Sequence, residues 1–211
     1  MKAFSKLFFL IILVNFLQGC IGMAVVGGGG YIAGKMAVGD RRTLGTKTKD
    51  ISTSLEVKRR ASSIAGEFGR ISVTTFNGLV LLTGEIRDDL LKNEVEKQIL
   101  TIKGVRSLEN DLEVAPLSDF NARTRNTIIS GKVKAALLDV KDIYVGSFKV
   151  HTDRGTVYLM GRVTQREGRL AAEAARNISA NIKKVVKLFD YITEDDLSDM
   201  VNVTEEQDEK K

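Results

Sequence analysis

The sequence has few of the residues on which catalytic and metal sites most often depend. It contains one cysteine, Cys20, and one histidine, His151, among 211 residues. A single cysteine excludes an intramolecular disulfide, and a lone histidine without further cysteines excludes the usual zinc sites. A Ser-His-Asp triad could be built only around His151, and no paired carboxylates form a recognisable catalytic pattern. We therefore expect no enzyme activity, no metal and no cofactor, and we expect His151 to be an ordinary strand residue.

Aromatic residues are also scarce, at 6%, and tryptophan is absent. The net charge of +5 would suit nucleic acid, but proteins that bind single strands stack the bases on aromatic side chains. Residues 29–36 nearly match a phosphate-binding loop, yet Met36 stands where a serine or threonine would ligate magnesium. We expect neither nucleic acid nor a small-molecule substrate as a partner.

What the sequence does contain is a duplication at an offset of 77 residues. Residues 71–86 align without a gap on residues 148–163, and both stretches have the pattern of two strands joined at a glycine. A second glycine, Gly84, falls on Gly161 at the same offset. A repeat of this length indicates two copies of one small domain.

The beginning of the chain has the features of a secretion signal. Lys2 and Lys6 precede an apolar run over residues 7–17. That run is about half the length needed to span a bilayer. We therefore expect a lipoprotein signal peptide over residues 1–19, which is removed from the mature protein.

The end of this segment predicts a lipid anchor. Leu-Gln-Gly-Cys at residues 17–20 resembles the lipobox of bacterial lipoproteins, in which the cysteine receives acyl chains such as palmitate after cleavage. Ile21 stands where an inner-membrane retention signal would usually have aspartate. We expect Cys20 to be lipidated and the protein to be anchored in the outer membrane, facing the periplasm.

Charge is distributed unequally along the chain. Residues 49–115 hold 10 Lys and Arg against 11 Asp and Glu, whereas residues 123–193 hold 14 against 6. Residues 194–211 hold 2 against 8. The second copy is therefore basic beside a neutral first copy, which indicates a separate binding role for it.

Pro116, the only proline, marks the junction between the copies. The glycine-rich stretch after Cys20 has no sustained period and is typical of a flexible tether. The acidic end has few large apolar residues, which is typical of disorder. The expected order is a signal peptide (1–19), a tether (20–48), a first domain (49–115), a linker (116–122), a second domain (123–193) and a disordered tail (194–211).

Each copy is predicted to fold as helix, strand, strand, helix, strand. In the first copy a helix is expected over residues 55–68, and Asn77-Gly78 predicts a tight hairpin turn. In the second copy, Thr164 and Glu167 have the spacing of a capping box. The predicted fold class is α+β, with two tandem αββαβ domains, each a three-stranded sheet with two helices packed on it. Because each domain of about 70 residues has a small core, we expect the two to pack together.

These features together resemble the BON domain, an αββαβ module of exported bacterial proteins. The resemblance rests on the strand-glycine-strand pattern and on the glycine-valine step at Gly104-Val105. With two copies behind a lipobox, the chain is similar to the dual-BON-domain lipoproteins of the Gram-negative outer membrane, the DolP family. The stretches that carry the similarity are residues 17–20, 24–27, 40–46, 155–167 and 189–192.

The resemblance implies binding rather than catalysis. Members of the family bind anionic phospholipid through the second BON domain, maintain envelope integrity, gather at the cell division site and are linked to the β-barrel assembly machinery. Their lipid surface is the start of the first helix of the second domain, which corresponds to residues 126–134 here. The family pattern has an aromatic residue where this chain has Ile128. A lower affinity is therefore expected, because isoleucine lacks the interfacial preference of tryptophan.

The helical pattern of this segment agrees with the implied site. At about 100° per residue the inner stripe is centred near Ile129 and Val140, and Ile128 falls to one side, next to Arg125 and Lys132. An apolar side chain between cations is typical of a helix that lies in a membrane interface. Each such cation contributes about 1 kcal/mol near an anionic surface. The candidate phospholipid-binding residues are Arg123, Arg125, Ile128, Ile129, Lys132 and Lys134.

Three other interpretations stay open at this point. Ile128 could pack at the rim of the core, with the charges forming a solvated face. The chain could instead be a protein-interaction adaptor for an envelope assembly complex such as the β-barrel assembly machinery. The acidic tail could also screen the basic domain within the molecule.

Overall fold

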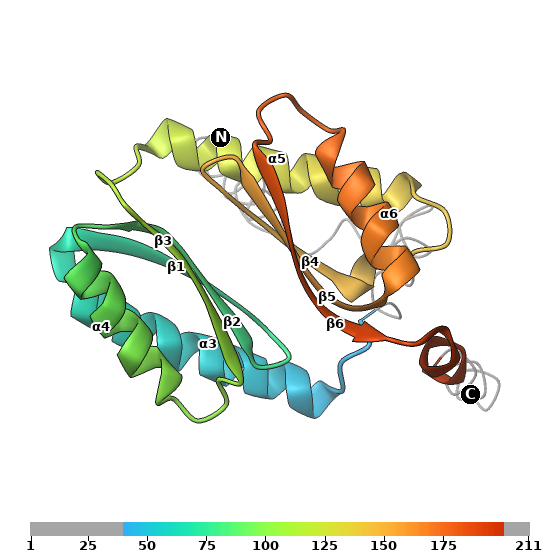
Figure 1. The fold of residues 1–211 in the computed structure, drawn as a ribbon, viewed down its shortest axis with the longest axis horizontal. Helices are drawn as coiled ribbons and strands as arrows, with labels where there is room; N and C mark the ends of the chain where they lie inside the picture. Colours follow the sequence, from blue (N-terminus) through green and yellow to red (C-terminus); the bar gives the residue numbers. More distant parts are fainter. Residues whose placement is uncertain (1–39, 201–211) are drawn as a thin grey trace, which may run out of the picture.

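The computed structural model describes residues 40–200 of the chain. Within them, two three-stranded sheets face each other, and helices cover the outer face of each sheet (Figure 1). The predicted signal peptide, Cys20, the tether up to residue 39 and the last residues, 201–211, lie outside the described residues.

The first domain has the predicted αββαβ order. Its strands are arranged β1-β2-β3, with β2 antiparallel to β1 and parallel to β3. Asn77 and Gly78 join β1 to β2 with φ angles of 48° and 76°, the positive values that a two-residue hairpin turn requires. The elements are α3 (Leu44–Ala65), η2 (Gly66–Phe68), β1 (Gly69–Phe76), β2 (Leu79–Ile86), α4 (Asp89–Leu100) and β3 (Ser107–Val114).

The second domain repeats this topology and its register. Ile71 pairs with Gly84 in the first sheet, and Phe148 pairs with Gly161 in the second, which preserves the offset of the sequence repeat. The capping box at Thr164 forms as predicted, with both of its reciprocal hydrogen bonds present. The elements are α5 (Phe120–Asp139), η3 (Val145–Ser147), β4 (Phe148–Asp153), β5 (Thr156–Thr164), α6 (Gln165–Arg176) and β6 (Lys184–Ile192).

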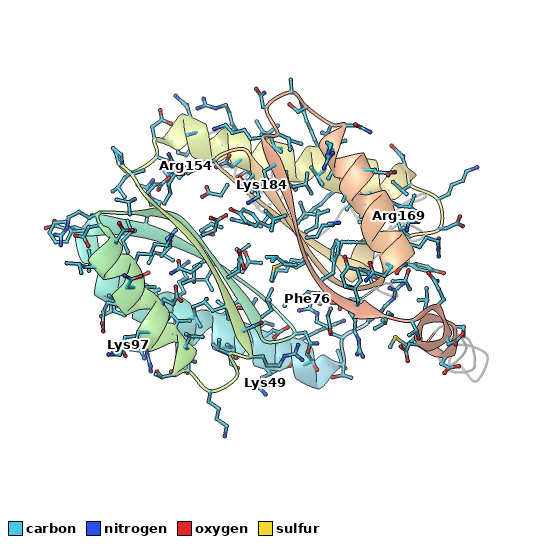
Figure 2. All side chains as sticks on the ribbon, viewed as in Figure 1. Lys49, Phe76, Lys97, Arg154, Arg169 and Lys184 are labelled. Atoms are coloured by element: carbon cyan, nitrogen blue, oxygen red, sulfur yellow. The ribbon has the colours of Figure 1, made fainter. Side chains whose placement is uncertain are left out.

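The two domains share a third core between their sheets. Phe76 and Leu81 of the first domain pack there against Tyr158 and Met160 of the second, and Phe76 lies between the sheets in Figure 2. The outer face of each sheet is buried separately under its own pair of helices. Both faces of the central strands are therefore covered, and the layers follow the order helices, sheet, sheet, helices.

Helix α3 begins earlier than the sequence predicted, at Leu44 instead of residue 55. Thr43 caps it by accepting a hydrogen bond from the backbone N–H of Thr46. The first turns gave no inner apolar stripe because their buried positions are polar, Asp50 and Thr53. The predicted tether is consequently wrong over residues 44–48.

Two further boundaries differ from the prediction because polar side chains cap helices there. Helix α5 starts inside the predicted linker, since Asp119 accepts a hydrogen bond from the N–H of Ala122. Residues 194–200, predicted to be disordered, are helical. Thr193 and Asp196 cap each other at the start of this helix, each side chain accepting from the other residue's N–H.

Candidate functional site

Helix α5 places two neighbouring isoleucines in opposite environments. Ile129 is 8% exposed and packs with Val133 and Leu137 in the core of the second domain. Ile128 is 52% exposed. One residue turns an α-helix by about 100°, which separates the two side chains. The side chain of Ile129 thus belongs mainly to the core, and its contact with lipid stays a prediction.

Ile128 lies with two of the predicted cations in an open groove. Arg125, Ile128 and Lys132 line this groove, which has a volume of about 400 Å³. We call it the α5 groove. Its far side consists of the β4–β5 turn and the loop between α6 and β6, which contribute Arg154 and Lys183. Four cations thus surround one exposed apolar side chain, and no carboxylate is among the described lining residues.

Arg154 and Lys183 were missed at the sequence level because they reach the α5 groove only through the fold. Lys183 is fixed by its backbone N–H, which donates to the carbonyl of Gly155 at 2.8 Å. Arg154 is held from the other side, since its guanidinium pairs with Glu113 at 2.5 Å and Glu85 at 3.5 Å in the first domain. The one available signal was the repeat, which aligns Arg154 with the turn residue Asn77.

The remaining predicted cations lie on the other flank of α5. Arg123 lines a separate cleft of about 440 Å³ between the domains, together with His151. The pKa of Lys149 is lowered by burial, then by the charge of Arg42 and, to a smaller extent, by the charge of Lys134. Lys134 therefore lies on the side of α5 that is near Lys149. The structure therefore divides the predicted set. The residues that line the α5 groove are Arg125, Ile128, Ile129 and Lys132, and Arg123 and Lys134 do not line it.

An exposed aromatic residue at the start of α5 also escaped the sequence prediction. Phe120 is 73% exposed, and the Arg123 guanidinium lies over its ring at 5.7 Å from the centroid. Phe120 was missed because it fell in the predicted linker. The chain thus has an exposed aromatic two turns before Ile128, although it has none at Ile128 itself.

The single histidine is bound at the interface of the two domains. His151 forms a hydrogen bond of 2.8 Å between its Nε2 and the hydroxyl of Thr83, across the domain interface. Burial, and secondly the charge of Lys149, lower the pKa of His151 to about 4. Within residues 40–200 no group of three or more potential ligands could hold a metal ion. None of the helices in that range is long and apolar enough to cross a bilayer.

Comparison with known proteins identifies the family. The model of the BON domain matches residues 49–116 and 125–193. The chain is 33% identical over 191 residues to the outer membrane lipoprotein DolP of Haemophilus influenzae, and the alignment covers 89% of this chain and 96% of that protein. The chain belongs to the DolP family of dual-BON-domain proteins. The resemblance and the fold class inferred from the sequence are both confirmed.

Two further comparisons give lower identities. A 21 kDa hemolysin of Actinobacillus pleuropneumoniae is 27% identical over 155 residues, covering 72% of this chain and 79% of that protein. Among solved structures, the C-terminal domain of CdsD, a structural protein of the type III secretion system of Chlamydia trachomatis, is 11% identical with a TM-score of 0.29. That alignment covers 64% of this chain and 96% of the CdsD chain, and its TM-score is too low to bear on fold or function.

Proposed function

We propose that the protein is a lipoprotein of the outer membrane that faces the periplasm, binds anionic phospholipid through the α5 groove and supports envelope integrity. Cys20 carries the acyl anchor, and no reaction is catalysed. The observation that supports this function most directly is the exposed Ile128 between Arg125 and Lys132, in a groove lined by cations without carboxylates.

The expected free energy of membrane binding indicates why an acyl anchor is needed. Arg125, Lys132 and Lys183 each contribute about 1 kcal/mol near an anionic surface. Burying the exposed half of Ile128 adds about 1 kcal/mol. A total of about 4 kcal/mol corresponds to a dissociation constant near 1 mM, which is weak for a free protein. The acyl chains on Cys20 hold the domain near the membrane, and this raises the effective concentration of lipid headgroups.

Charge reversal within the α5 groove tests the proposal. We expect Lys132→Glu to weaken binding to phosphatidylglycerol vesicles by roughly 30-fold, because it replaces an attraction with a repulsion and costs about 2 kcal/mol. Ile128→Glu should weaken binding comparably. The measurement is vesicle co-sedimentation of the full mature chain with Cys20→Ala, so that the acyl anchor does not mask the effect.

Two matched variants on the same helix serve as controls. Lys134→Glu makes the same charge change on the other flank, and Leu138→Glu alters a side chain that is 46% exposed. Both should lose far less affinity than Lys132→Glu and Ile128→Glu. Equal losses in all four variants would show that only net charge matters and would contradict a specific groove.

Crosslinking in intact cells separates lipid binding from an adaptor role. A photoreactive side chain at position 132 should form adducts mainly with phospholipid. A dominant protein adduct at this position would contradict lipid binding there and favour an adaptor for an assembly complex such as the β-barrel assembly machinery.

A further inference from the structure

A second groove lies at the boundary of the two domains, and the proposed function does not use it. It has a volume of about 360 Å³ and runs between the first half of α3, the end of β1 and the start of β4. We call it the α3 groove. The residues that matter for its chemistry are Arg42, Lys47, Ile51, Leu55, Thr75 and Lys149.

One wall of the α3 groove is an exposed apolar ridge. Ile51 and Leu55 are 63% and 66% exposed, and their spacing of four residues places them on one face of α3. Leu44, seven residues before Ile51, continues the same face and is 80% exposed. Three large apolar side chains in one row present a continuous surface to solvent.

The opposite wall is cationic. Arg42 is neutralised by Asp40 and Asp50, at 2.9 and 2.8 Å, and Lys47 pairs with Asp40 at 3.4 Å. Lys149 donates to the carbonyl of Thr75 at 3.0 Å and forms no ion pair within 4.0 Å among residues 40–200, although the charges of Asp50 and Asp40 act on it from farther away. The α3 groove therefore has an excess of positive charge around Lys149.

Thr75, which lines the α3 groove, also has a buried hydroxyl without a partner. Thr75 is 1% exposed, and its Oγ1 has no hydrogen-bond partner among the described residues. Leaving a buried hydroxyl unsatisfied costs about 1 to 3 kcal/mol. A ligand that hydrogen-bonds to Thr75 would remove this cost.

The chain itself contains a segment of matching chemistry. Residues 201–211 begin with two valines at alternate positions, Val201 and Val203, and continue with four carboxylates. Glu194, the first residue of the helix that precedes this segment, pairs with Arg166 at 3.4 Å, and the charge of Arg41 near the start of α3 also acts on it. Eleven residues can span about 35 Å, which is long enough to reach back from that helix.

We propose that residues 201–211 bind in the α3 groove of the same chain. The valines pack against Ile51 and Leu55, and the carboxylates that follow lie near Lys47 and Lys149. This contact covers an apolar ridge that would otherwise be free to meet other proteins. It leaves the α5 groove open, since α3 and α5 lie on opposite outer faces of the molecule (Figure 1).

Carbodiimide crosslinking of the full mature chain tests this contact, because the reagent joins only lysines and carboxylates that touch. We expect links from Lys47 or Lys149 to Glu205, Glu206, Asp208 or Glu209. Their yield should fall several-fold in 1 M salt, where the Debye length is about 3 Å. The matched control is Lys97, an exposed lysine on α4 away from the α3 groove (Figure 2).

A chain that ends at residue 200 provides the second measurement. It retains every described element, so the deletion leaves the fold intact, and the backbone amide signals of Ile51, Leu55 and Thr75 should shift in NMR spectra. Unchanged amide signals would overturn the proposal, as would tail links to Lys97 as frequent as those to Lys149. Links between isotopically distinct chains would also overturn it, because they would show a contact between two copies. Neither measurement involves lipid, so its outcome is independent of the proposed function.

Discussion

At the scale of single residues, neighbours in the sequence often serve different parts of the molecule. Arg41 reaches the second domain, where its guanidinium bonds to both carboxylate oxygens of the buried Glu167, at 2.7 and 2.8 Å. Arg42 turns to the first domain, bonding to Asp50 and lying 4.2 Å from the centroid of the Phe76 ring. Two consecutive side chains thus tie the domains together in a segment that the sequence predicted to be part of a flexible tether.

His151 gives the domain interface a defined dependence on pH. Its pKa of about 4 in the folded protein is below its ordinary value of 6.5, so folding favours the neutral ring. The stability that this preference contributes is complete above pH 6.5 and is lost as the pH falls from 6.5 through about 4. Near pH 4 the loss is roughly 3 kcal/mol.

His151→Gln tests this dependence, because glutamine can still hydrogen-bond to Thr83 but does not titrate. Between pH 8 and pH 4 the free energy of unfolding in urea should fall by about 3 kcal/mol more in the natural protein than in the variant. Asp153, whose pKa is raised chiefly by burial, has the opposite dependence but is present in both proteins and cancels. Parallel pH profiles would show that His151 does not contribute.

At the scale of the elements, glycines at the same repeat position allow the same close approach of strands in the two hairpins, β1–β2 and β4–β5. Gly84 has a φ of +115°, and a Cβ there would lie 2.0 Å from the carbonyl oxygen of Arg70. At Gly161 a Cβ would lie 2.5 Å from the carbonyl oxygen of Ser147. In both domains the backbone of the central strand therefore approaches its neighbour too closely for a side chain.

Two Gly→Ala variants should change stability in opposite directions. Gly84→Ala combines a backbone clash with a strained φ and should destabilise the protein by about 3 kcal/mol. Gly131, within α5, has open space around it, and Gly131→Ala should stabilise the protein by about 1 kcal/mol through helix propensity. Urea unfolding of both variants measures the difference. Similar values for the two would contradict the geometry of the central strand.

The elements that the sequence predicted well are those with a strong local signal. The turn at Asn77-Gly78 and the capping box at Thr164 depend on a few adjacent residues, and both form as expected. The start of α3 depends on contacts that are distant in sequence. Asp50, for example, is buried because it accepts hydrogen bonds from the N–H groups of Asn77 and Gly78. No local pattern contains that information.

At the scale of the whole molecule, the sequence predicted the duplication, the fold class and the basic second domain. It did not predict how the sheets face each other, because a continuous apolar run such as residues 79–82 indicates a strand buried on both faces without showing what covers them. The composition of the lipid site could not be predicted fully either, because it combines residues that are distant in the sequence. Arg125 and Lys132 share the α5 groove with Lys183, which lies far along the chain, while Lys134 of the same helix faces elsewhere.

This arrangement gives the molecule two outer faces with different chemistry. The α5 face is cationic around Ile128, whereas the α3 face has a row of apolar side chains that begins at Leu44. Because the two helices cover opposite sheets, a single bilayer cannot contact both faces at once. Lipid binding through the α5 groove therefore requires that the membrane select the α5 face.

An NMR titration of the full mature chain, with Cys20→Ala, against phosphatidylglycerol bicelles tests this claim most directly. We expect the amide signals of Leu44 and Leu55 to stay unchanged and the largest shifts to occur at Arg125, Ile128, Lys132 and Lys183. The largest shifts on the α3 face, or no site that saturates, would contradict it.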